Sequence, residues 1–325
     1  MLGILGGTPL NLVERSLRLE ATHGLGARPR PELVGPVLAG ISDALLDAVR
    51  MGFRHSSRAP GRVPASLRAA ADVRYLGLEG QNDTASVLHF GVPRFDVAAA
   101  ELFKQGRLWN EGPQPEDTAF ELLGSALRDI GGRVTDSSSF DRGILRRVRA
   151  YDRLLDRGLR RIEMPDTVSA HRGHVDRGVV DAARELLTST PRPRRVRVMG
   201  RLDTIAVSQA VMRIEVTPGM LVTATWEGQG KVDAFRSLLN EDVVAEGQGV
   251  FRPSGTLLRV DVDALAPATA RDEAFRFVPF APALTVYGGA IKLRPGEHSS
   301  IASIIGRIPG EESDEVFAAA VDQLS

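Results

Sequence analysis

The chain has 325 residues, which is more than one simple hydrophobic core accommodates, and this length favours two or three domains. Hydrophobic residues make up 43% and charged residues 25% of the chain, which excludes a fibrous or wholly disordered protein. The 41 basic and 41 acidic residues balance, which argues against a protein that coats nucleic acid but permits a local basic patch.

The chain contains no cysteine, and this excludes disulfides, thiolate catalysis and cysteine-ligated metals. No stretch approaches the roughly 20 apolar residues that a membrane span needs. The first residues lack the basic region that opens a secretory signal. We therefore expect a cytoplasmic protein.

Residues 1–190 are predicted to form an α+β domain. Apolar and polar residues alternate over 13–21, which indicates a strand with one buried face. Pro31 opens a helix that keeps apolar spacing to about residue 50, and an Arg-rich loop follows at 53–64. The next elements in the chain are strands at 73–78 and 85–90, helices at 97–105, 115–130 and 139–155, a strand at 159–164 and a helix at 179–187.

A Pro-rich joint at residues 189–193 marks the predicted start of a second domain, residues 191–266. Its predicted strands lie at 195–202, 211–216, 221–226, 243–251 and 256–262, with a helix at 232–239 after the third. This order is that of an OB-like five-stranded β-barrel. An SH3-like barrel is the alternative.

Residues 267–325 are predicted to be an irregular segment followed by a C-terminal interaction tail. Phe275, Phe277 and Phe280 stand close together, and we expect them to pack against a neighbouring domain. Ser313 is placed to cap a last helix whose apolar face includes Phe317.

The barrel supplies candidate nucleic-acid contacts, because OB-type barrels bind single strands with stacking aromatics and a positive groove. The candidates are Arg201, Arg213, Trp226 and Arg252, with the loop from Arg54 to Arg62 as a further basic element. A barrel that docks protein or is purely structural is the alternative.

The sequence contains little that indicates an enzyme. His171, His174 and Asp176 have ligand-type side chains at close spacing, but no second ligand cluster accompanies them. Ser56 and Ser57 lie beside His55, but no nucleophile-elbow motif is present. We therefore assign no catalytic residue, no metal and no cofactor, and expect a protein that is not an enzyme.

The tail carries the sequence Ile305-Gly306-Arg307-Ile308-Pro309-Gly310-Glu311-Glu312-Ser313-Asp314-Glu315. It resembles the C-terminal motif of antitoxin-like bacterial proteins encoded beside PIN-domain nucleases, with Ile308 where Trp is common. The barrel, with Gly200-Arg201-Leu202-Asp203 and Phe251-Arg252-Pro253-Ser254-Gly255, is also similar to an uncharacterised bacterial family.

The resemblance implies that the tail lies over the acidic metal site of a partner nuclease. Ile305, Ile308, Pro309 and Phe317 would then be anchors, and Arg307 would reach the acidic cluster. This chain is longer than most antitoxins and shows no leading DNA-binding module.

Two hypotheses follow. The first is a non-enzymatic, antitoxin-like interaction protein whose tail binds and restrains a partner protein, such as a PIN-type nuclease. The second is a nucleic-acid-binding accessory protein that uses the OB-like barrel.

Overall fold

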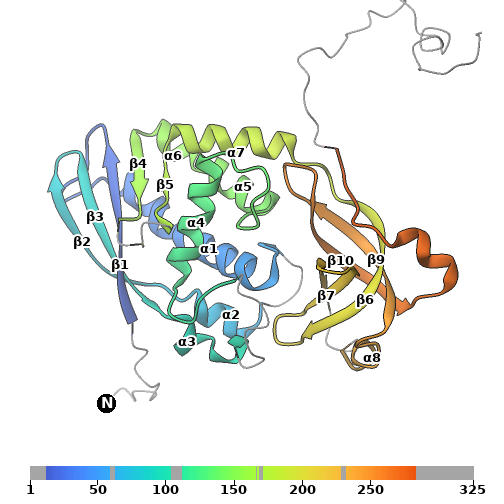
Figure 1. The fold of residues 1–325 in the computed structure, drawn as a ribbon. Coiled ribbons are helices and arrows are strands. Elements are labelled where there is room, and N and C mark those ends of the chain that lie inside the picture. Colours follow the sequence, from blue (N-terminus) through green and yellow to red (C-terminus); the bar gives the residue numbers. More distant parts are fainter. Residues whose placement is uncertain are drawn as a thin grey trace, which may run out of the picture. The chain divides into compact units, whose positions relative to one another are not determined.

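The computed structural model describes residues 12–58, 63–103, 112–165, 167, 171–227 and 232–282. All described helices and strands belong to one compact unit, residues 1–284. An antiparallel sheet with its helices comes first, and a closed barrel follows (Figure 1). The α+β class predicted from the sequence is therefore confirmed.

The N-terminal sheet has five strands in the order β2-β3-β1-β4-β5, and every neighbouring pair is antiparallel. The strands are β1 (Leu12–Ala21), β2 (Arg74–Asn82), β3 (Ala85–Pro93), β4 (Leu159–Glu163) and β5 (His174–Val175). Leu17 and Leu19 on β1 are buried, as the alternation predicts, and Leu17 lies opposite Leu88.

Helices pack beside this sheet (Figure 1). They are α1 (Pro31–Arg54), α2 (Ala65–Ala70), α3 (Phe95–Ala98), the 3₁₀ helix η1 (Ala100–Phe103), α4 (Ala119–Gly131), α5 (Arg142–Ala150), α6 (Asp152–Asp156) and α7 (Arg177–Ser189). The start of α4 is set by a capping box of Thr118 and Glu121. Asp141 and Asp176 are simple N-caps of α5 and α7, where each side chain accepts backbone N–H groups.

Two predicted elements need correction. The helix expected over 97–105 is the short α3 followed by η1. The helix expected over 139–155 begins only after Asp141 and divides at Tyr151, whose N–H bonds to Val148 in a tighter 3₁₀-type turn. The strand β5 was not predicted, since two residues are too few to show an alternation.

The barrel consists of β6 (Arg194–Ala206), β7 (Val211–Thr217), β8 (Met220–Trp226), α8 (Val232–Arg236), β9 (Asp242–Phe251) and β10 (Leu257–Pro267), and the 3₁₀ helix η4 (Ala270–Phe275) comes after it. The closed order is β10-β8-β7-β6-β9, with β10 parallel to β8 and the other pairs antiparallel. With its helix between the third and fourth strands, this is the OB-like order predicted from the sequence.

Apolar side chains fill the barrel interior. Val198, Met212, Ile214, Ala224 and Val260 are all fully buried there. Gly247 permits a close strand contact, because a Cβ at this position would lie 2.1 Å from the carbonyl oxygen of Asp261. The interior is therefore a packed core of side chains.

One buried arginine joins the barrel to the N-terminal part. Arg259 on β10 donates from Nη1 to the carbonyl of His55 at 2.8 Å and from Nε to Asp261 at 2.7 Å. Its Nη1 also lies 3.7 Å from Asp141, the residue that caps α5. Val250 and Leu258 of the barrel are part of the N-terminal hydrophobic core. The two parts therefore share both a core and a polar clamp.

His55 lies within this junction. It ends α1 in the left-handed conformation, with φ of 52°. Burial, together with the charges of Arg213, Arg259 and Arg252, lowers the pKa of His55 from 6.5 to about 4. The ring is therefore neutral at physiological pH.

We expect Arg259→Ala to lower the free energy of unfolding by about 3–5 kcal/mol, because it leaves buried acceptors without their donor. Arg195→Ala is the control, since its ion pairs are exposed and should cost about 1 kcal/mol or less. Urea unfolding followed by circular dichroism measures both values. Equal losses would show that the clamp does not stabilise the junction.

The protein should lose stability as the pH falls from 6.5 to 4, because the unfolded chain then binds a proton at His55 that the folded chain excludes. The expected contribution is about 1–3 kcal/mol. His55→Asn keeps a residue that tolerates the left-handed conformation and should flatten this part of the pH profile. An unchanged profile in the variant would contradict the assignment.

Candidate nucleic-acid interface

OB-type barrels customarily bind nucleic acid on their second and third strands and in two loops, which lie between strands one and two and between strands four and five. In this chain the strands are β7 and β8, and the loops are residues 207–210 and 252–256. The outward-facing Val211 and Thr225 on these strands are only 4% and 8% exposed. One end of the customary face is therefore covered.

Both customary loops contact the N-terminal part of the chain. The carbonyl of Gln209 accepts a hydrogen bond of 3.0 Å from Nε of Arg54, at the end of α1. In the other loop, Ser254 donates from Oγ to Asp136 at 2.8 Å and from its backbone N–H to Thr135 at 3.0 Å. The loops that bind ligands in other OB-type barrels are here used for an intramolecular contact.

The four residues nominated from the sequence do not gather into one surface. The side chain of Trp226 lies in the barrel core at 3% exposure, with its ring centroid 5.7 Å from that of Phe235. To stack on a base it would have to leave that core. Arg252 donates to the carbonyl of Leu257 at 2.6 Å, and Arg201 is exposed and bonds to Asn240 at 3.2 Å.

Arg213 is half-buried, and its charge, like that of Arg252, acts on His55. These two nominated arginines therefore belong to the junction rather than to an open surface. Burial also lowers the pKa of Arg252, although the guanidinium remains charged.

A second surface of the barrel has the features that a single strand needs. We call it the β6 groove, with a volume of about 500 Å³. One wall comes from β6 and β9, and the other from the end of η4 and the segment that follows it. Its lining includes Arg194, Arg195, Arg197, Glu246, Phe275, Phe277 and Phe280.

The arginines of the groove are held in place. Arg195 bonds to Glu246 and Asp263 at 3.1 Å each, and Arg197 lies 3.2 Å from Glu246. Arg194 donates to the backbone carbonyl of Phe280. The two arginines beside Glu246 lower the pKa of that carboxyl. The three guanidinium groups of the lining outnumber their two carboxylate ion-pair partners, Glu246 and Asp263.

The aromatic wall corrects a prediction. Phe277 and Phe280 are 53% and 55% exposed, whereas the sequence suggested that these rings pack against a neighbouring domain. Pro279 and Ala281 are the buried residues of this stretch instead, and the Ala281 N–H bonds to Gly255. Pro279 and Ala281 therefore anchor the chain, while the two rings face solvent.

The sequence contained a signal for this groove. Arginines alternate along β6, which places Arg195 and Arg197 on the outward face. Their proximity to the phenylalanines depends on the path of the chain after β10. Arg197 lies over the ring of Phe275, with its guanidinium carbon 5.4 Å from the ring centroid.

The candidate catalytic and metal-binding side chains have structural partners. His171 contacts Ser125 through Nδ1 at 2.6 Å, and His174 lies 3.2 Å from Asp176, the cap of α7. Ser57 donates to Asp141 at 2.5 Å. Within the described ranges, no group of three or more potential ligands is arranged to hold a metal ion.

The nominated tail residues Ile305, Arg307, Ile308, Pro309 and Phe317 lie outside the described residues. Among the helices in the described part of the chain, none is long and apolar enough to cross a membrane.

Comparison with known proteins identifies no relative: no protein-family model, curated protein or solved structure matches the chain.

Proposed function

We propose that the protein is a non-enzymatic accessory protein that binds single-stranded nucleic acid in the β6 groove. The observation that carries this proposal is the exposure of Phe277 and Phe280 beside three arginines. Every base presents an aromatic face, so exposed rings next to positive charge bind single strands with little dependence on sequence.

The arginines would contact the phosphates. Arg195 and Arg197 are already oriented by Glu246, which limits the side-chain entropy lost on binding. Their exposed ion pairs are weak and can exchange for contacts to phosphate oxygens. Affinity should therefore fall as salt rises, because each neutralised phosphate releases counterions.

A single strand suits this groove better than a duplex. In a duplex, the base faces are stacked on one another and are not available to Phe277 and Phe280. The customary OB loops cannot contribute while they contact the N-terminal part of the chain. The proposal therefore moves the binding surface from β7 and β8 to β6 and the segment after η4.

We expect the double variant Phe277→Ala, Phe280→Ala to weaken binding of labelled oligo(dT) or oligo(U) by about tenfold or more, because each stacked base contributes about 1–3 kcal/mol. Met220→Ala, Leu221→Ala is a matched control on β8, where these side chains are 50% and 43% exposed. Fluorescence anisotropy at fixed salt gives the affinities. A larger loss in the control would place binding on the customary face instead.

We also propose, on the sequence of the tail, that Ile305, Ile308, Pro309 and Phe317 bind a partner protein, with a PIN-type nuclease as the implied partner. The observation favouring this is an apolar strip, a Pro-Gly break and an amphipathic stretch in succession. The tail would then restrain the partner, and Arg307 would approach its acidic site.

A chain ending at Ser300 should lose this partner in a pull-down from source-cell lysate, whereas the full chain retains it. Ile308→Asp in the full chain should have the same effect, because a carboxylate cannot occupy an apolar pocket without a large desolvation cost. Nuclease treatment of the lysate separates protein contacts from contacts through nucleic acid. Recovery of the same protein by all three chains would exclude the tail as the recognition segment.

A further inference from the structure

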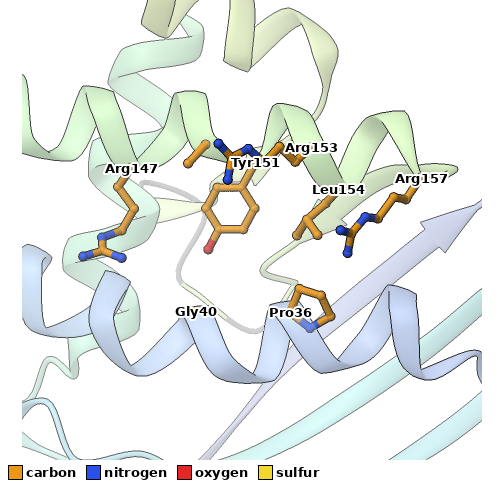
Figure 2. A pocket seen from close by; sticks show the side chains of 8 residues that line it. Pro36, Gly40, Arg147, Tyr151, Arg153, Leu154 and Arg157 are labelled. Atoms are coloured by element: carbon orange, nitrogen blue, oxygen red, sulfur yellow. The ribbon is translucent and has the colours of Figure 1, made fainter.

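A separate pocket lies between α1 and the α5–α6 segment. Figure 2 shows the ring of Tyr151 projecting from α5–α6 towards α1, with Arg153 beside it and Leu154 between it and Arg157. The pocket has a volume of about 290 Å³, at the lower end of the range for small-molecule sites. It shares no lining residue with the β6 groove.

The lining carries positive charge only. Arg147, Arg153 and Arg157 contribute to it, and no carboxylate does. Arg147 is held on α5 by Asp47 at 2.5 Å and Asp43 at 3.4 Å. Within the described part of the chain, the side chains of Arg153 and Arg157 have no hydrogen-bond or ion-pair partner. Two guanidinium groups at the rim are therefore available to an anion.

The rest of the lining is mainly apolar. Pro36 and Gly40 come from α1, and Leu154 comes from α6 (Figure 2). Burial raises the pKa of Tyr151, so its hydroxyl stays protonated and can donate a hydrogen bond. The pocket thus combines apolar lining residues with neutral and cationic hydrogen-bond donors.

Gly40 keeps the pocket open. Glycine inside a helix lowers helix stability relative to alanine, so its presence there has a cost. A Cβ at Gly40 would lie 4.0 Å from Oη of Tyr151, and a longer side chain would extend into the space between the helices. Gly35 on the same helix is exposed and has no atom within 4 Å of such a Cβ. It is therefore a matched position at which a side chain leaves the pocket open.

We propose that this pocket binds a small organic phosphate, whose apolar part lies between Pro36, Tyr151 and Leu154 and whose phosphate contacts Arg153 and Arg157. Planar guanidinium groups suit phosphate, because they donate two parallel hydrogen bonds. Phosphate also carries more charge than a carboxylate, which suits the two guanidinium groups of Arg153 and Arg157.

Phenyl phosphate is the probe, with phenol and inorganic phosphate as partial ligands. Isothermal titration calorimetry of the full chain should show saturable binding of phenyl phosphate, with both partial ligands at least about tenfold weaker. The double variant Arg153→Ala, Arg157→Ala should lose at least about tenfold in affinity. Its control is Arg149→Ala, Arg160→Ala, which removes the same charge from two exposed arginines outside the pocket.

Steric closure tests the location independently of charge. Gly40→Leu should abolish binding and Gly35→Leu should preserve it, with both variants checked for native circular dichroism. Equal binding in the two leucine variants, or equal loss in the two arginine pairs, would overturn the proposal, as would the absence of saturable binding. Inorganic phosphate binding as tightly as phenyl phosphate would reduce the site to an ion site without an organic specificity. The outcome of these measurements does not depend on whether the β6 groove binds oligonucleotides.

Discussion

The buried guanidinium of Arg259 is the constraint on which the arrangement of this protein depends. A charge at 5% exposure is stable only when its hydrogen bonds are satisfied, and two of its partners, His55 and Asp141, lie in the N-terminal part of the chain. Asp141 in turn accepts from Ser57 and caps α5. The end of α1, the start of α5 and the last barrel strand are therefore held by one polar network.

This junction determines which barrel surface is open. The two loops that OB-type barrels customarily offer to nucleic acid are bonded to Arg54 and Asp136, and the end of the β7–β8 face is buried. The exposed rings and the outward arginines occur instead along β6 and the segment after η4. The surface proposed here for binding therefore differs from the one that OB-type barrels customarily use. In this protein, the customary surface contributes to the junction with the N-terminal part.

The β6 groove and the pocket between α1 and the α5–α6 segment suit ligands of different kinds. The groove offers aromatic faces beside paired arginines, which favours an extended chain with repeated phosphates. The pocket is smaller and carries two unpaired guanidinium groups at its rim within the described residues, which favours a single compact phosphate ester. The tail adds a third kind of contact in the antitoxin-like proposal, and the variants described above separate all three.

The local pattern of residues determined most element types, the order of strands and helix along the barrel and the buried face of α1, because periodicity reports which side of an element is apolar. Tertiary structure alone decided the sites. The sequence around Trp226 is compatible with a base-stacking ring and with a core residue. Only its contact with Phe235 in the folded chain shows that the ring lies inside the barrel. Likewise, Phe277 became exposed and Arg259 buried through contacts with residues far away in the chain, and no local pattern encodes such contacts.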